Sequence, residues 1–171
     1  LRRLFIINEI EQFSKRQVKA IIHQLIVKSW YPLSDSRWIA LTTGGLVVEE
    51  IDEFPYNVLM MSSHRHQHRY WEYNLTGPEN CGVSVLSSDF PLTIRSWNVG
   101  DSIVQKYGTK KLNRWFIDHK VPPWLRKIWP VIVNSQNEVI YIAGIGRSAD
   151  RQALPINAYL TFKKGDSYVK K

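Results

Sequence analysis

Residues 91–151 combine cations, aromatic residues and the glycines and prolines that begin or end helices, all within one compact stretch. Residues 131–133 and 139–142 are apolar and flank four turn-forming residues, which predicts a β-hairpin. Residues 124–129 follow two prolines and end before Pro130, which leaves room for one short helix. This half of the chain is therefore expected to form a mixed or antiparallel sheet with short helices.

The first half of the chain predicts a helix followed by a hairpin. Ser14 and Gln17 have the spacing of a capping box, and the apolar residues after them repeat at helical spacing, so a helix is expected over residues 14–28. Residues 38–41 and 46–50 flank a Thr-Thr-Gly-Gly turn, which predicts a hairpin.

Charge divides the chain into a neutral half and a basic half. Residues 1–90 contain 9 Lys and Arg against 10 Asp and Glu, a net charge of −1, whereas residues 91–171 contain 14 against 5, a net charge of +9. Turn-forming residues 76–80 lie near the change. We therefore predict an α+β fold of two small modules, a neutral one over residues 1–85 and a basic one over residues 86–171. The basic module predicts a polyanionic partner, and nucleic acid is favoured over a membrane surface.

The remaining composition limits the class of protein. The one cysteine, Cys81, excludes an internal disulfide and favours the cytoplasm. No apolar run reaches the about 18 residues of a membrane-spanning helix, and the N-terminal residues lack the features of a signal peptide. The chain starts at Leu1 rather than at methionine, so we expect it to be a piece of a longer protein.

Three histidines alternate with polar residues at His64, His66 and His68. In an extended strand they would share one face, so metal binding is chemically possible. Their polar flanks, however, favour a linker between strands. A separate histidine, His119, has no suitable nucleophile or carboxylate partner for acid–base catalysis. The sequence therefore predicts neither a metal site nor a catalytic residue.

Basic residues gather around a further predicted helix. Thr109 is a suitable N-cap for a helix whose apolar face starts at Leu112. The cations that then project away from the core are Lys110, Lys111 and Arg114. Lysines in a first turn oppose the helix dipole, whereas a bound polyanion would use both the lysines and the free backbone N–H groups. The aromatic residues expected in the core, rather than stacked on bases, are Trp115, Phe116, Trp124 and Trp129.

A series of short motifs follows one another in this half: Ile94-Arg95, Gly100-Asp101, Gly108-x-Lys110-Lys111-Leu112, Phe116-Ile117-Asp118-x-Lys120-Val121-Pro122, Arg126, Trp129-Pro130 and Gly144-Ile145. In order and spacing these motifs resemble the C-terminal domain of the tRNA(Ile)-lysidine synthetase family. The first half resembles the preceding domain of that family through Lys15-Arg16-Gln17-Val18-Lys19 and the hairpin after it. The resemblance implies an enzyme that uses ATP to join lysine to the wobble cytidine of an isoleucine tRNA, so that the tRNA reads AUA.

The resemblance also implies which functions lie outside this sequence. The catalytic N-terminal domain of the family carries a Ser-Gly-Gly-x-Asp-Ser motif that does not occur here, so this chain is expected to be non-catalytic and to bind no cofactor. ATP with magnesium, and lysine, are expected at the missing domain, and a homodimer is possible for the full-length protein. Ser102 stands where the family often has arginine.

The family's C-terminal domain holds the tRNA acceptor stem. The residues that the resemblance therefore assigns to RNA binding are Arg95, Lys110, Lys111, Arg114, Lys120, Arg126 and Arg147. Alternatives stay open for single residues and for the partner. Lys120 could cap a helix C-terminus, and Arg126 could be an ordinary solvated side chain. The basic module could also bind an acidic protein instead of RNA.

Overall fold

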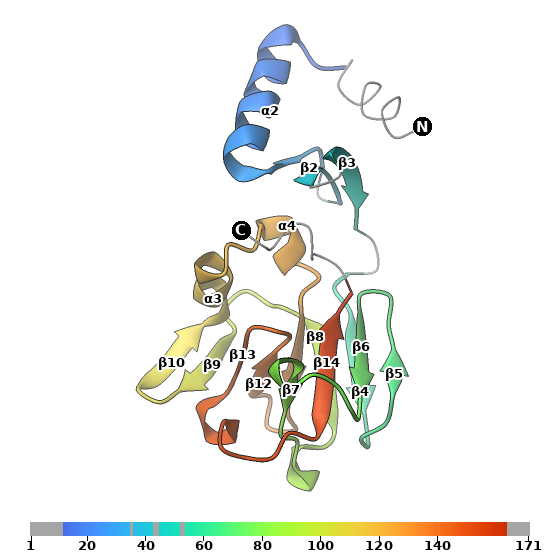
Figure 1. The fold of residues 1–171 in the computed structure, drawn as a ribbon, viewed down its shortest axis with the longest axis vertical. Helices are drawn as coiled ribbons and strands as arrows, with labels where there is room; N and C mark the ends of the chain where they lie inside the picture. The colour runs from blue at the N-terminus through green and yellow to red at the C-terminus, as the bar shows by residue number, and fades with distance from the viewer. Residues whose placement is uncertain (1–11, 35, 43–44, 52–53, 164–171) are drawn as a thin grey trace. The chain divides into compact units, whose positions relative to one another are not determined.

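The residues that the computed structural model describes are 12–34, 36–42, 45–51 and 54–163. They form two compact units, and the division falls between residues 52 and 53 (Figure 1). Both units combine strands with helical segments, so the predicted α+β class is confirmed.

The division differs from the boundary expected between residues 85 and 86. Residues 54–85 belong to the second unit because their strands pair with strands far along the chain. Strand β4 (Asn57–Met60) pairs with β8 (Leu92–Ser96), and β6 (Trp71–Asn74) pairs with β14 (Ala158–Phe162). The change in charge along the sequence gives no indication of either strand pairing.

The first unit contains the predicted helix and hairpin. Helix α2 (Lys15–Lys28) begins at the N-cap Ser14, whose side chain accepts from the Gln17 N–H while the Gln17 side chain accepts from the Ser14 N–H. Ile21 and Leu25 are the buried residues of α2, and they form a core cluster with Ile39. The antiparallel strands beside the helix are, in sheet order, β1 (Trp30–Pro32), β2 (Arg37–Thr42) and β3 (Gly45–Glu50).

The second unit is built on a seven-stranded mixed sheet. Its strand order is β10-β9-β12-β11-β8-β4, and β13 pairs with β12 beside this path. The strands not yet located are β9 (Ser102–Gln105), β10 (Gly108–Lys111), β11 (Pro130–Val133), β12 (Val139–Ile142) and β13 (Gly146–Arg147). All residues of β11 and β12 are buried, and these two strands are the predicted hairpin. The pairing of β12 with β9 is parallel, so the sheet is mixed as expected.

A second, antiparallel sheet in the same unit has the order β5-β6-β14-β7. Its short outer strands are β5 (His66–Gln67) and β7 (Gly82–Val83). Strand β14 lies between β6 and β7, so a late segment of the chain joins two early ones.

Two short helices precede β11. Helix α3 (Leu112–Asp118) and helix α4 (Pro123–Arg126) place Phe116 and Trp124 in the core, where both are at most 1% exposed. Trp129 is also buried and its indole N–H donates to the Ala143 carbonyl, whereas Trp115 is only partly buried. The core assignment of these aromatics is therefore confirmed for three of the four.

A buried ion pair joins two loops of the second unit. Arg151, in the 3₁₀ turn Ala149–Arg151, donates from both terminal nitrogens to the two carboxylate oxygens of Asp89 and from one of them to the Ser84 carbonyl. The two side chains are only 6% and 5% exposed. Burial by itself raises the pKa of the Asp89 carboxyl, but the hydrogen bonds from Arg151 and from the Leu86 N–H outweigh burial and lower it.

We expect this carboxyl to contribute to acid unfolding. Because the pKa of Asp89 is lower in the folded state than the about 3.9 of an unfolded chain, its contribution is complete above that value and is lost as pH falls through the lower folded pKa. The free energy of unfolding in urea, measured from about pH 5 to about pH 2, should therefore fall more steeply for the unaltered chain than for Asp89→Asn. Equal slopes would contradict this assignment.

The three histidines of residues 64–68 take part in local packing. The His68 ring stacks on Trp71 with ring centroids 4.7 Å apart, and the His66 ring lies 5.4 Å from the same indole. Within the described residues no group of three or more potential ligands could hold a metal ion. Among the same residues no helix has both the length and the apolar character needed to cross a membrane.

Candidate nucleic-acid interface

The predicted cluster of cations lies on a hairpin that leads into a helix. Strands β9 and β10 pair in antiparallel register around the turn Lys106-Tyr107, and helix α3 follows β10 directly (Figure 1). Gly108 has φ +131°, a conformation that favours glycine and allows the chain to enter β10 straight after the turn.

The expected helix start at Thr109 is wrong. Thr109 pairs with Val104 in the sheet, and the helix begins at Leu112 after Lys111, which makes no side-chain capping hydrogen bond. Lys110 and Lys111 therefore stand on a strand instead of in a first helical turn. The cross-strand pairing with β9, across the two-residue turn, overrides the capping signal of Thr109.

Lys110 is held in place by two partners on α3. Its ammonium lies 2.8 Å from the Asp118 carboxylate and 4.3 Å from the centre of the Trp115 ring. The hydrogen bond and the positive charge of Lys110 lower the pKa of the Asp118 carboxyl. The Lys110 side chain is still 33% exposed, so it can meet a ligand while it ties the hairpin to the helix.

Three further cations of the cluster face solvent. Lys111, Arg114 and Lys120 are exposed. Within the described part of the chain, none of the three side chains makes a hydrogen bond or an ion pair. Lys120 follows α3 with φ +56°, and its backbone N–H closes the helix by donating to the Ile117 carbonyl. Arg114 acts within the unit at longer range, since its charge helps to lower the pKa of the Asp118 carboxyl, and all three side chains remain exposed to a ligand.

Two of the predicted RNA-binding arginines have internal partners instead. Arg95 makes a bidentate pair with Asp101 at 2.8 and 2.9 Å, and the arginine side chain is only 12% exposed. Arg126 donates to the Val121 carbonyl at 2.7 Å and to the Asn113 side chain at 3.1 Å. Both arginines thus hold the loops that flank the interface.

Arg147 is connected to the cluster through Trp115. Its neighbour Gly146 lies so close to the Trp115 indole that an added Cβ would be 3.1 Å from the ring. The guanidinium of Arg147 reaches the Gly82 carbonyl at 3.4 Å. We use the name basic face for this set of connected cations: Lys110, Lys111, Arg114, Lys120 and Arg147.

Sequence reasoning missed the hairpin turn itself. Tyr107 is 91% exposed, and the Lys106 ammonium lies 5.4 Å from the centre of its ring. An exposed aromatic beside a cation suits contact with a nucleotide. The signal was present, since the segments on either side of the Lys106-Tyr107-Gly108 turn have strand-like sequences.

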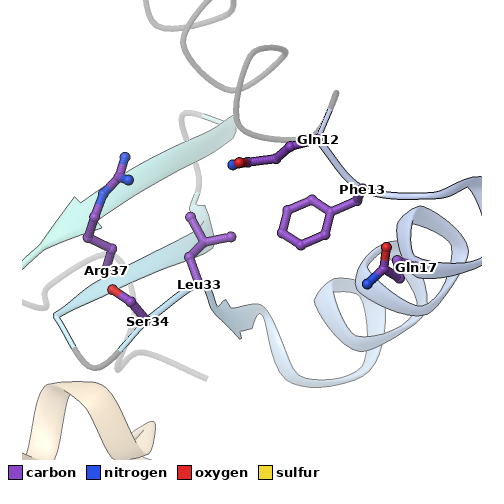
Figure 2. Close-up of a pocket in the computed structure, with 6 residues that line it drawn as sticks. All are labelled: Gln12, Phe13, Gln17, Leu33, Ser34 and Arg37. Carbon is purple, nitrogen blue, oxygen red and sulfur yellow. The ribbon is translucent and has the colours of Figure 1, made fainter.

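A hollow of about 370 Å³ lies in the first unit (Figure 2). Its lining residues are Gln12, Phe13, Gln17, Leu33, Ser34 and Arg37. Phe13 and Leu33 pack against the core cluster of α2. The side-chain carbonyl of Gln17 accepts a hydrogen bond from the Ser14 N–H. The Ser34 hydroxyl is in this lining, but no histidine, cysteine or carboxylate lies beside it there to form a catalytic pair or a metal-ligand set.

The fold and the basic face define an α+β domain with a cationic surface on a hairpin and a helix. Residues 92–160 match the family model described as "TilS substrate C-terminal domain". The motifs quoted from the sequence, from Ile94 to Ile145, lie within this matched segment.

Comparison with characterised relatives agrees with the family match. The chain is 43% identical over 78 residues to tRNA(Ile)-lysidine synthase of Bacillus subtilis (strain 168), which covers 42% of this chain and 16% of that protein. It is 40% identical over 58 residues to the enzyme of the same name from Staphylococcus aureus (strain COL), covering 33% and 14%. The matched segments thus span less than a fifth of either relative.

One solved structure, described as "Crystal structure of TILS C-terminal domain", superposes with a TM-score of 0.42 and 20% sequence identity. The match covers 81% of this chain and 93% of that one.

Proposed function

We propose that this chain is the tRNA-binding C-terminal portion of a tRNA(Ile)-lysidine synthase and that it docks the acceptor stem of the tRNA on the basic face. The observation that carries the proposal is the exposure of Lys111, Arg114 and Lys120 on one hairpin–helix element of the matched domain. Within the described residues these three side chains make no ion pair, which leaves them available to an external polyanion.

The charge of the second unit supports an RNA partner. Residues 54–163 contain 13 Lys and Arg against 7 Asp and Glu, a net charge of +6. An A-form helix offers phosphates and 2′-hydroxyls on its surface, while its deep major groove excludes side chains. An exposed surface of lysines and arginines therefore suits recognition by phosphate contact, and Tyr107 at the hairpin turn would add one contact to a ribose or base.

The chemistry of the reaction belongs to the rest of the protein in this proposal. The relatives are named as lysidine synthases, and this chain carries no Ser-Gly-Gly-x-Asp-Ser motif. ATP with magnesium, lysine and the wobble cytidine would be bound by a separate catalytic domain, which ligates lysine to the base. The portion described here would position the tRNA and supply no catalytic residue.

The proposal is tested by fluorescence anisotropy with a labelled acceptor-stem RNA hairpin and a DNA hairpin of the same sequence and length. We expect tighter binding to the RNA, and an affinity that falls linearly with salt on a double-logarithmic plot. Equal, weak binding to RNA and DNA would contradict acceptor-stem docking and would favour the alternative, a module that binds an acidic protein.

A further inference from the structure

A second hollow, of about 340 Å³, lies in the second unit next to Arg147. Its lining residues are Glu79, Arg147, Gln152, Leu154, Pro155, Ile156 and Tyr159. This lining combines one cation, one carboxylate, one amide and one aromatic ring with an apolar wall. Its volume is at the low end of the about 300–1,000 Å³ that is typical of small-molecule sites.

The Tyr159 ring is fixed in this hollow by two glycines. An added Cβ at Gly77 would lie 3.0 Å from the ring, and one at Gly82 would lie 2.9 Å from the ring and 2.3 Å from Ile156. Gly82 also pairs with Tyr159 across the β7–β14 ladder. The backbone therefore packs against the aromatic ring, which is partly exposed and forms a wall of the hollow.

The hollow continues the basic face. Lys110 lies over the Trp115 ring, the same ring lies against Gly146, and Arg147 is the next residue along the chain. A nucleic acid that follows the basic face would reach the hollow at Arg147.

The chemistry of the lining selects an unpaired nucleotide. A base can stack on an aromatic ring only when it is not inside a duplex, and the cation beside the ring suits the phosphate. The Glu79 carboxylate repels phosphate, but it can accept a hydrogen bond from an exocyclic amino group such as that of cytosine. The phosphate is thus directed to Arg147 and the base to Tyr159 and Glu79.

We infer that this hollow binds a single-stranded nucleotide at the end of the docked RNA, with its base on Tyr159 and its phosphate at Arg147. The inference rests on the proposed function, since it places the nucleotide next to the duplex that the basic face would hold. The inference adds a site that binds the unpaired nucleotide at the end of the stem, whereas the basic face would bind the paired stem.

The test compares two acceptor-stem hairpins, one blunt and one with three unpaired cytidines at its 3′ end, and the readout is the ratio of their affinities for the same protein. Stacking on an aromatic side chain is worth at least about fivefold per base, so we expect the unaltered chain to prefer the overhang by about that factor or more. In Tyr159→Leu, which keeps an apolar side chain but removes the ring, the ratio should return to about one. Lys111→Ala should weaken the binding of both hairpins and keep the ratio of the unaltered chain, because Lys111 stands on β10 and does not line the hollow.

A base analogue gives a second readout that does not depend on affinity. 2-Aminopurine in the overhang should lose fluorescence when it stacks in the unaltered chain and should not do so in Tyr159→Leu. Tight binding of both hairpins with a ratio of one would overturn the inference and leave the acceptor-stem proposal intact. A preference that survives in Tyr159→Leu would also overturn it. Failure of both hairpins to bind better than DNA would overturn the proposed function as well.

Discussion

Asp89→Asn is expected to destabilise the second unit by about 3–5 kcal/mol, because removing one partner of a buried ion pair leaves the other charge uncompensated. The Arg151 guanidinium would keep its hydrogen bond to the Ser84 carbonyl but lose both carboxylate oxygens in a site where its side chain is 6% exposed. Urea denaturation followed by tryptophan fluorescence measures the change, since four of the seven tryptophans fall within residues 97–129.

Asp118→Asn is the matched control for this experiment. Asp118 also pairs with a cation, Lys110, at 2.8 Å, but its side chain is 46% exposed. An exposed pair contributes little, so its loss should leave the denaturation midpoint nearly unchanged. Equal losses of stability in the two variants would contradict the assignment of Asp89 and Arg151 as a buried ion pair that stabilises this unit. Combining Asp89→Asn with Arg151→Met should cost less than the sum of the two single changes, because no buried charge is then left unpaired.

Replacing Lys111, Arg114 and Lys120 together by alanine is expected to have the largest effect on RNA affinity. Each phosphate contact contributes about 0.9 to the salt dependence, so the slope of the double-logarithmic plot should fall by about 2.7 and the affinity at about 0.1 M salt by about two orders of magnitude. Because these side chains are exposed and make no hydrogen bond within the described residues, the fold should not change. Circular dichroism and the denaturation midpoint check this point.

A second triple variant, of Lys15, Arg16 and Lys19 on α2, removes the same charge from the first unit. These residues are also exposed. We expect a small loss of affinity from the lower net charge and a nearly unchanged salt slope, because the lost cations make no phosphate contact in this proposal. The same loss in both triple variants would show that binding depends on net charge and not on the basic face.

The parts of the fold that depend on neighbouring residues were predicted from the sequence. The capping box at Ser14 and the hairpin of β11 and β12 are encoded by spacing within a few residues, and both were found. The short helix α4 was expected for the same reason, since prolines limit where a helix can begin and end.

The pairings that residues make outside their own helix or turn were not predicted. Thr109 has the chemistry of an N-cap, but its pairing with Val104 places it in a strand. Arg95 looked like a phosphate ligand, but the fold brings Asp101 to its guanidinium. Asp89 and Arg151 are 62 residues apart, and nothing near either residue indicates its partner.

The position of β14 in the four-stranded sheet has a consequence for the growing chain on the ribosome. This strand, Ala158–Phe162, completes the sheet between β6 and β7, which were synthesised more than 70 residues earlier. Until it emerges, the facing edges of β6 and β7 remain without a partner strand, and unpaired edges are the sites at which chains associate wrongly. Nascent chains of this protein therefore need the greatest protection from one another just before residues 158–162 leave the exit tunnel.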